Sequence, residues 1–518
     1  MESYTLLKVT AFGFIFELNS ESCYFAQNGD FEIFLNGQFY GTANTNVISL
    51  LSLGSDMVYN VAVKNFFDED IVFSVNTLKP GFVINVKDYN AAGDGVACDT
   101  AAINLAIYAA PAGSTVYIPK GKYMVDQVLL KSNVDIHLES GAVLCHGFDR
   151  EKLAILKGYQ KNYDHKDVTI NASWEGHPLD CYASLIYGKD IENVHIYGEG
   201  VIDGNGDIGG FWHNPKVKNK AFRPKNVFLV NCRNIEISGL TSMNSASWNI
   251  HPFYCDNVSL RCLKIKSIEE SPNTDGINPE SCNNIDIIGC HFSVGDDCIA
   301  IKAGKYYMSI AHPRFTKNVN IRQCFMEKGH GGVVIGSEMS CGVYNVSVEK
   351  CLFRETDRGL RIKTRRGRGK DAIVDGIIFS KVEMQKVRHC FVVNMFYNCD
   401  PDGKSNYVRD KEPRPRDEFT PTIKNISLTE VIAREITGSA VFIYGLPESP
   451  VCGISVEKSI LSFVDEAQRI HECPAMMDDF DTIKNLGIFI KNAQDVKLEE
   501  NEIIGEAFCM TAQPTRKE

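Results

Sequence analysis

A short motif of asparagine, a branched aliphatic residue, any residue and a second aliphatic residue recurs along most of the chain. Its aliphatic positions alternate with polar ones, so each strand has one apolar face. The motif begins at Asn133, Asn193, Asn234, Asn257, Asn284, Asn318, Asn345 and Asn425. From Asn234 to Asn345, successive members are 23, 27, 34 and 27 residues apart. These spacings predict a parallel β-helix whose asparagines adopt the left-handed conformation at each turn and hydrogen-bond between coils.

The first 80 residues follow a different pattern. Short β-rich runs separated by turn residues predict a small antiparallel β-sandwich; the runs are residues 6–18, 31–35, 47–53, 59–63 and 71–75. The segment 51–63 is similar to the tyrosine-corner region of a fibronectin type III domain. We therefore expect an all-β protein, with a fibronectin type III-like β-sandwich over residues 1–80 and a parallel β-helix carrying the functional site over residues 81–518.

One helix and two irregular segments interrupt the β pattern. The apolar face of the predicted helix is formed by Ile103, Ala106, Ile107 and Ala110. Asp99-Thr100 is expected to cap this helix and residues 111–113 to end it, so that the helix covers the open end of the β-stack. Residues 158–186 and 386–420 lack a clean repeat, and we interpret them as excursions from the β-helix wall.

Composition and charge limit the function classes. The formal net charge of −11 over 518 residues argues against nucleic-acid binding, and the lack of a run of about 18 apolar residues argues against a membrane span. The 18 cysteines lack metal-ribbon spacings, and some recur six residues after the repeat asparagine, as Cys290, Cys324 and Cys351 do. We interpret them as reduced core residues. Because residues 1–6 alternate like a strand, we expect a cytoplasmic protein, secreted or periplasmic if a leader was removed; the oligomeric state stays open.

Four clusters of reactive or charged residues follow one another between residues 273 and 370. They are Asn273-Thr274-Asp275-Gly276, Gly295-Asp296-Asp297-Cys298, Gly329-His330-Gly331-Gly332 and a basic run that starts at Arg361-Ile362-Lys363. The intervals between the acidic, imidazole and basic residues of successive clusters are 21, 33 and 31 residues. Intervals close to one repeat unit place the clusters on neighbouring coils. We therefore expect three carboxylates, one imidazole and several cations to meet on one face, as in an active site.

The adjacent pair Asp296 and Asp297 points to proton-transfer chemistry. On a regular strand the two side chains face opposite ways, so both line one site only if the chain bends between them. Coupled carboxylates do not all ionise together. That behaviour suits glycoside hydrolysis, in which one carboxylic acid protonates the leaving oxygen and one carboxylate activates water. A calcium site or a polar turn is the alternative for an isolated pair, but the neighbouring clusters favour catalysis.

His330 and the basic run complete the set of candidates. His330 lies between glycines, where the backbone can approach a ligand closely, and we expect its imidazole to hydrogen-bond an aspartate. Residues 358–370 carry seven positive charges and no acid. A structural histidine and a solvated basic loop are the alternatives. Beside three carboxylates, however, guanidinium groups suit a polyanionic sugar because they bind carboxylates bidentately.

The order Asn-Thr-Asp, Gly-Asp-Asp, Gly-His-Gly and Arg-Ile-Lys resembles that of the polygalacturonases, family 28 glycoside hydrolases with the pectin-lyase-like right-handed β-helix fold. The resemblance extends over residues 82–460. It implies that Asp296 is the general acid, that Asp275 and Asp297 position and deprotonate the water, and that His330 assists the acid. It also implies inversion of configuration, no metal or other cofactor, and substrate ligands among Asn273, Lys305, Arg361, Lys363 and Tyr397.

A finer resemblance, over residues 359–369, 394–397 and 444–448, is to bacterial exo-polygalacturonases with an N-terminal fibronectin-like domain. It implies release of galacturonate from the non-reducing end of oligogalacturonides derived from pectin. We expect the excursions 158–186 and 398–420 to close one end of the groove, and uronate carboxylates to be bound by Arg365, Arg366 and Arg368. The alternatives are a hydrolase of rhamnogalacturonan or xylogalacturonan, and a non-catalytic glycan-binding β-helix.

Overall fold

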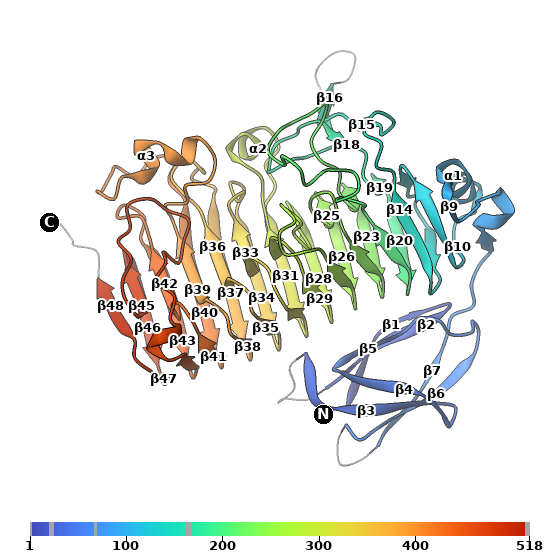
Figure 1. The fold of residues 1–518 in the computed structure, drawn as a ribbon, viewed down its shortest axis with the longest axis horizontal. Helices are drawn as coiled ribbons and strands as arrows, with labels where there is room; N and C mark the ends of the chain where they lie inside the picture. Colours follow the sequence, from blue (N-terminus) through green and yellow to red (C-terminus); the bar gives the residue numbers. More distant parts are fainter. Residues whose placement is uncertain (1–2, 20–24, 67–69, 162–167, 513–518) are drawn as a thin grey trace.

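The computed structural model of the protein describes residues 3–19, 25–66, 70–161 and 168–512. Its N-terminal part is a sandwich of two antiparallel sheets (Figure 1). One sheet has the order β1 (Tyr4–Thr10), β2 (Gly13–Leu18), β5 (Val47–Leu50), and the other has the order β4 (Gln38–Thr45), β3 (Ala26–Leu35), β6 (Val58–Lys64), β7 (Ile71–Asn76). The run 6–18 is therefore a hairpin of two strands. Strand β4 was not predicted, because none of its side chains is buried and its sequence lacks apolar alternation.

The predicted tyrosine corner has the expected hydrogen bond. The hydroxyl of Tyr59 accepts from the backbone N–H of Gly54, 2.8 Å away and five residues upstream. Aromatic and branched side chains from both sheets form the sandwich core, among them Phe14, Phe16 and Phe31. The fibronectin type III character and the boundary at residue 80 stay predictions.

The rest of the chain is a parallel β-helix with three long faces (Figure 1). The first sheet contains β8 (Val83–Asn85), β10 (Ser114–Ile118), β13 (Val134–Leu138), β20 (Glu192–Gly198), β23 (Arg233–Ser238), β26 (Asp256–Arg261), β28 (Asn283–Ile288), β31 (Thr316–Arg322), β34 (Val343–Glu349), β37 (Ile373–Ser380), β40 (Thr422–Thr429), β43 (Val451–Glu457) and β46 (Ala493–Glu499). The second sheet contains β9 (Asp94–Cys98), β11 (Gly121–Val125), β14 (Ala142–His146), β21 (Val201–Asp203), β24 (Thr241–Met243), β27 (Lys264–Lys266), β29 (His291–Ser293), β32 (Phe325–Met326), β35 (Leu352–Arg354), β38 (Glu383–Gln385), β41 (Ile432–Ile436), β44 (Ile460–Phe463) and β47 (Glu502–Ile504).

The third sheet is the face that matters for function. It starts with β12 (Val128–Leu129), β19 (Ile186–Lys189), β22 (Val227–Val230) and β25 (Ile250–Phe253). It continues with β30 (Asp297–Ile301), β33 (Gly331–Gly336), β36 (Arg358–Lys363), β39 (His389–Asn394), β42 (Val441–Tyr444), β45 (Leu486–Lys491) and β48 (Phe508–Ala512). Parallel bridges from Ile250 to Ile277 and from Ile277 to Ile299 join the two parts. The all-β, parallel β-helix fold expected from the sequence is confirmed.

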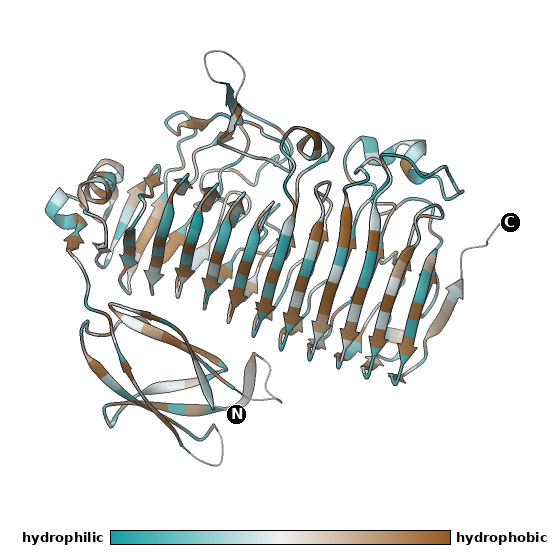
Figure 2. Ribbon diagram, turned by 180° about the vertical axis from the view of Figure 1, so that it is seen from behind, coloured by the Kyte–Doolittle hydropathy of each residue, from teal (hydrophilic) through white to brown (hydrophobic). Residues whose placement is uncertain are grey.

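The hydrophobic pattern explains this architecture. Apolar and polar residues alternate along the strands (Figure 2), and the aliphatic positions fill one continuous core. All eight repeat asparagines have positive φ, as predicted. Seven of them form a ladder from Asn133 to Asn345, with amide-to-amide distances of 2.9–3.2 Å between neighbouring coils. Gly376 takes the next position and Asn425 then bonds to Asp375, so the ladder stops where the side chain is lost.

The core cysteines also stack between coils. Cys290, Cys324 and Cys351 are fully buried, and the backbone N–H of Cys324 lies 3.5 Å from the Cys351 sulfur. Cys232, Cys255 and Cys282 form a second column with N–H to sulfur distances of 3.4 and 3.3 Å. Every cysteine within the described residues is free. Stacked thiols are therefore small core side chains here, as the spacing indicated.

Helix α1 (Thr100–Ala109) covers the N-terminal end of the stack and buries Ile103, Ala106 and Ile107, as expected. Asp99 occupies the N-cap position as expected, but its side chain does not cap the helix. Its carboxylate instead accepts from the backbone N–H groups of Ala92 and Gly93, at 2.5 and 3.0 Å. The tight turn before β9 competes for this side chain, because it leaves two N–H groups with no strand partner.

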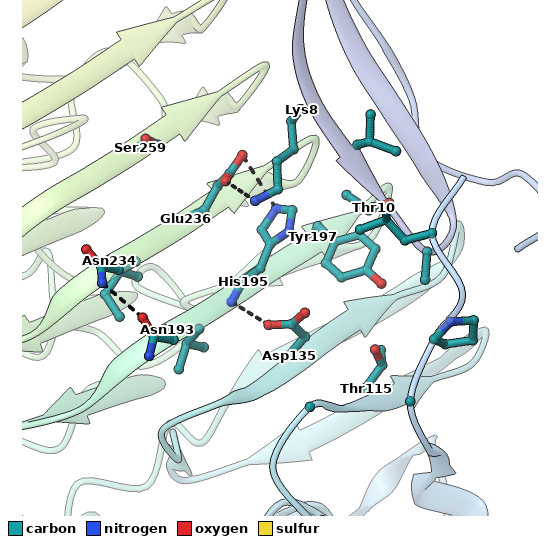
Figure 3. Close-up of a pocket in the computed structure, with 18 of the residues that line it drawn as sticks. Lys8, Thr10, Thr115, Asp135, Asn193, His195, Tyr197, Asn234, Glu236 and Ser259 are labelled. Atoms are coloured by element: carbon teal, nitrogen blue, oxygen red, sulfur yellow. Dashed lines mark hydrogen bonds and ion pairs between the residues drawn. The ribbon is translucent and has the colours of Figure 1, made fainter. Parts of the chain in front are cut away.

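The sandwich packs against the β-helix through polar and apolar contacts. Lys8 pairs with Glu236 of the helix at 2.7 Å (Figure 3), and Glu17 pairs with Arg322 three coils further on. Ile15, Val47, Leu51 and Ile288 form a small shared core. Phe12 stacks on His137 with ring centroids 4.7 Å apart. A polar groove of about 560 Å³ remains between β1 and the outer face of the first sheet.

Two long excursions leave the β-helix on either side of the third sheet. The first, residues 147–185, contains β15 (Ile155–Leu156), β16 (Tyr159–Lys161), β17 (Val168–Ile170) and β18 (Cys181–Tyr182); residues 162–167 of the predicted excursion lie outside the described part. The second, residues 395–421, contains η2 (Asp402–Lys404) and α3 (Asn406–Arg409), so the repeat continues to Asn394, beyond its predicted end. Smaller elements are η1 (Val86–Tyr89), α2 (Tyr306–Ala311) and η3 (Glu466–Gln468). None of the helices found in the described residues is long and apolar enough to cross a membrane.

Candidate active site

The four sequence clusters come together on the outer face of the third sheet. The bridges Ile277–Ile299 and the pairings of Ile299 with Val333 and Val333 with Leu360 place them on four consecutive coils. Adjacent strands lie about 4.8 Å apart, so side chains from neighbouring coils touch one another. The expectation that the clusters occupy adjacent coils is confirmed.

The chain bends where the sequence required it. Residues 295 and 296 form a bend, and strand β30 begins at Asp297. The next two residues, Cys298 and Ile299, are both in the core, so the regular alternation is broken just after Asp297. This irregularity turns Asp297 outward, beside Asp296, whose carboxylate accepts from the Asp297 N–H at 2.9 Å.

Asp297 is held by two cations from two coils away. Its carboxylate lies 2.9 Å from the Lys363 ammonium and 3.6 Å from the Arg361 guanidinium. Gly331 occupies the coil between them, where a Cβ atom would lie 3.2 Å from the Asp297 carboxylate and 3.8 Å from the Arg361 side chain. Burial works to raise the pKa of Asp297, but Lys363 and Arg361 more than offset it and lower the pKa to about 2. Asp297 is therefore a carboxylate at neutral pH.

Asp275 is equally buried but has weaker support for its charge. The Asn278 side-chain amide donates to it at 2.7 Å, and the Lys302 ammonium lies 3.9 Å away. Burial raises the pKa of Asp275 well above its ordinary value, and the charge of Asp296 adds to this effect. The site thus contains two buried carboxyl groups whose pKa values are shifted in opposite directions, Asp297 downward and Asp275 upward.

Asp296 is the more accessible carboxylate, with 22% of its side chain exposed. His330, half exposed, lies 3.4 Å from it, and the Asn273 amide approaches its other oxygen at 3.4 Å. Arg223 fixes Asn273 by donating to its side-chain oxygen at 2.5 Å. The hydrogen bond to Asp296 raises the pKa of His330 against the opposing effect of burial. This pair has the exposure and partner expected of a proton donor to a bound ligand.

Tyr397 and Lys305 border the same area. Tyr397 is buried, with its ring centroid 5.6 Å from the Lys363 ammonium. The Lys305 ammonium lies 3.4 Å from Asp400 and 4.0 Å from Glu175, which belong to the second and first excursions. Tyr397 therefore lies beside Lys363, the partner of Asp297, whereas Lys305 is engaged by carboxylates of the two excursions. Contact of either residue with substrate stays a prediction.

The placement of Arg365 and Arg366 contradicts their expected contact with substrate. Both are about 1% exposed and are engaged by the protein itself. Arg365 makes two 2.8 Å bonds to Asp402, and Arg366 binds Glu448 at 2.5 and 2.9 Å. Charge along a sequence does not reveal which way a side chain points, and here the guanidinium groups fasten the second excursion from inside. Arg368 is also buried, donating to Ser337 at 3.1 Å and lying 3.6 Å from Asp400.

Several residues of the site were not predicted. Lys302, Asn278 and Glu338 lie in or beside the carboxylate cluster, and Arg223 supports it from the loop before β22. Lys302 had a visible signal, because Ile301-Lys302 repeats the Ile362-Lys363 pattern two coils earlier. Glu338 and Arg223 lie in loops without a repeat, where spacing gives no register. No group of three His, Cys, Asp or Glu side chains in the described residues is placed to hold a metal ion.

Comparison with known proteins gives a consistent result. The sequence profile of the "Glycosyl hydrolases family 28" matches residues 110–458. The chain is 31% identical over 400 residues to a "Probable polygalacturonase" of Vitis vinifera, covering 74% of this chain and 75% of that protein. It is 27% identical over 415 residues to an "Exo-poly-alpha-D-galacturonosidase" of Dickeya chrysanthemi, covering 72% of this chain and 67% of that protein.

Solved structures share the fold over most of the chain. An exopolygalacturonase from Thermotoga maritima aligns with a TM-score of 0.67 at 24% identity, covering 82% of this chain and 93% of that one. A family 28 exopolygalacturonase from Yersinia enterocolitica aligns with a TM-score of 0.67 at 19% identity, covering 97% of this chain and 99% of that one.

Proposed function

The chain belongs to the glycosyl hydrolases family 28, and we propose that it is an exo-acting polygalacturonase. Membership of this family, together with the polygalacturonase relatives of the chain, makes the protein a glycosidase of polygalacturonate-type substrates. The proposal adds that it releases galacturonate from the non-reducing end of oligogalacturonides, with inversion of configuration. The names of the Dickeya, Thermotoga and Yersinia proteins support the exo mode.

In the proposed reaction the three aspartates divide into one general acid and two residues that activate water. Asp296, assisted by His330, gives a proton to the glycosidic oxygen as the bond to the anomeric carbon breaks. Asp297 and Asp275 orient a water molecule and take its proton as its oxygen attacks the anomeric carbon from the other side. The exposure of Asp296 and the fixed charge of Asp297 support this division. Arg361 and Lys363 then also face the sugar at the cleavage site.

The observation that carries the exo mode is the covering of the third sheet on the N-terminal side of Asp275. Trp174 of the first excursion packs in one apolar cluster with Phe228 of β22, Phe253 of β25 and Met308 of α2. An endo enzyme needs a groove open at both ends. Here the first excursion covers the outer face of the third sheet on one side of the carboxylates. A groove blocked on that side suits binding of the end of a polysaccharide chain.

Lys305 joins the two excursions over this covered part of the sheet. Its backbone N–H donates to the Gly176 carbonyl at 3.2 Å, and its ammonium lies near Glu175 and Asp400. A Cβ atom at Gly176 would lie 2.8 Å from the backbone nitrogen of Lys305, so this close approach of the two backbones requires a glycine. Lys305 therefore contacts both segments expected to close one end of the groove, residues 158–186 and 398–420, which together are called the end wall.

Product analysis tests the proposal. We expect monomeric galacturonate to dominate from the first time points of polygalacturonate digestion, with viscosity falling slowly and the new anomer inverted by proton NMR. Early mixed-length oligomers with a rapid loss of viscosity would instead show an endo enzyme. Faster release of sugars from rhamnogalacturonan or xylogalacturonan would favour the substituted-pectin alternative, and no release from any polymer would favour a glycan-binding role.

The end wall can be tested separately. Lys305→Ala removes the ammonium that joins the excursions and should allow longer products to appear. Lys328→Ala is the matched control, because Lys328 lies near the site but pairs only with the exposed Glu269 at 3.2 Å among the described residues. An unchanged product pattern in Lys305→Ala would contradict the role of this tie.

A further inference from the structure

Lys302 is a buried lysine placed between two buried carboxyl groups. Its ammonium lies 3.9 Å from Asp275 and 3.2 Å from Glu338, and only 4% of the residue is exposed. The ammonium also lies over the Trp248 ring, 4.7 Å from its centroid. An ammonium group buried in this way stays charged only if its anionic neighbours offset the hydration that it has lost.

The charges around Lys302 and Asp275 define what it can do. The other charged or titratable groups facing Asp275 are Asp296, Asp297, Arg223 and the Cys298 thiol. The groups facing Lys302, besides Asp275, Asp297 and Glu338, are Glu280, Glu175 and His251. Lys363 and Arg361 are engaged with Asp297, and Arg223 with Asn273. In the described part of the chain, Lys302 is the cation within 4 Å of Asp275.

We propose that Lys302 is a positioning residue of the hydrolase: oriented by Glu338, its ammonium favours the carboxylate form of Asp275, which, with Asp297, accepts the proton of the attacking water. This inference rests on the proposed function and deepens it, because it assigns the group that makes the second base available. Asp297 receives two cations from β36, whereas Asp275 receives one, which it shares with Glu338.

The electrostatics agree with the geometry. Burial raises the pKa of Asp275, Asp296 raises it further, and Lys302 is the largest opposing influence. Burial works to lower the pKa of Lys302, but Glu338 and then Asp275 more than offset it and raise the pKa. Lys302 is therefore charged across the working range, and it works to lower the pKa of Asp275 against the larger effects of burial and Asp296.

Two substitutions should have opposite effects. Lys302→Met removes the cation, so the pKa of Asp275 rises and the acidic limb of kcat/KM moves to higher pH by about 1 unit or more. Below that limb, kcat/KM falls about tenfold for each unit of displacement. Glu338→Gln removes the competing anion, so Lys302 serves Asp275 alone and the acidic limb moves to lower pH. A merely structural role does not produce shifts of opposite sign.

The pH profiles are measured on oligogalacturonides with the full-length protein, after product analysis of the wild type. Because Lys302→Met leaves Glu338 buried without its partner, the double variant Lys302→Met/Glu338→Gln is made in parallel. The double variant contains neither charge, and its acidic limb of kcat/KM should move to higher pH by the same amount as in Lys302→Met. An unmoved acidic limb in the folded variants overturns the proposal, whatever the loss of kcat.

An infrared titration of the aspartate carboxyl band gives a readout that does not need activity. The contribution of Asp275 is isolated as the difference between each protein and its Asp275→Asn counterpart. The midpoint should rise in Lys302→Met and fall in Glu338→Gln. An unmoved midpoint overturns the proposal even if the wild type hydrolyses no galacturonide, and a moved midpoint with an unmoved kinetic limb overturns the link between Asp275 and water activation.

Discussion

The Nδ1 atom of His330 lies 3.4 Å from a carboxylate oxygen of Asp296, at the most accessible point of the carboxylate cluster. The glycine before His330 makes this approach possible, since a Cβ atom at Gly329 would lie 2.6 Å from the Asp296 carbonyl oxygen. Asp275 and Asp297 lie buried on the same sheet face. The site therefore separates an exposed pair suited to donating a proton from a buried pair suited to activating water.

Asp296→Asn tests the proton donor. The amide keeps the size of the side chain but cannot act as a general acid, so kcat should fall by at least about 10³-fold while oligogalacturonide binding is largely retained. Single-turnover kinetics and calorimetric binding measure the two quantities. Turnover within tenfold of the wild type would contradict the assignment.

His330→Gln tests the partner of the acid. Since the hydrogen bond to Asp296 raises the pKa of His330, the pair retains a proton to higher pH than an ordinary imidazole does. Removing the imidazole should move the basic limb of the kcat profile to lower pH and reduce kcat about 10–100-fold at neutral pH. A proportional loss at every pH would show that His330 only packs against the site.

Arg366→Met separates structural cations from substrate ligands. The substitution leaves Glu448 buried without its partner and removes donors to the Tyr407 and Asp410 carbonyls, so unfolding free energy should fall by about 3 kcal/mol. The KM of the folded fraction should change little. Lys370→Met, in the same basic run but exposed, is the control and should leave denaturant unfolding unchanged.

The basic run shows where sequence reasoning stops. Spacing and alternation identify strands, the turn asparagines and the coil that carries each aspartate, because these follow from a fixed repeat. They do not give the direction of Arg365 and Arg366, which leave the third sheet after Lys363 and enter a loop without register. For the same reason Glu338, in a short loop after β33, had no signal, although Lys302 on the regular strand pattern did.

His137 should make stability depend on pH. Burial lowers its pKa from 6.5 to about 4. The unfolded chain binds a proton below about pH 6.5 and the folded protein does not until about pH 4, so stability is lost as pH falls through this window by about 3 kcal/mol. His137→Phe should remove this share of the loss in chemical unfolding series, whereas the exposed His213→Asn should not. An identical pH dependence in His137→Phe would contradict the prediction.

The thiols provide a fifth test. If the stacked cysteines are reduced core residues, a thiol count under denaturing, non-reducing conditions should approach 18. This result is also expected of the proposed cytoplasmic location. Several missing thiols that return on reduction would instead indicate disulfides and an oxidising compartment.

The docking of the sandwich has a consequence for how such a protein can change in length. Repeat folds gain and lose whole coils by duplication or deletion of one unit. Here Lys8 contacts Glu236 on β23 and Glu17 contacts Arg322 on β31. The sandwich is therefore anchored at the first and the last of four consecutive strands of the first sheet. A coil inserted between these contacts would separate them by about 4.8 Å and break one of them. Growth of the solenoid is therefore expected outside the interval between these contacts, toward its C-terminal end.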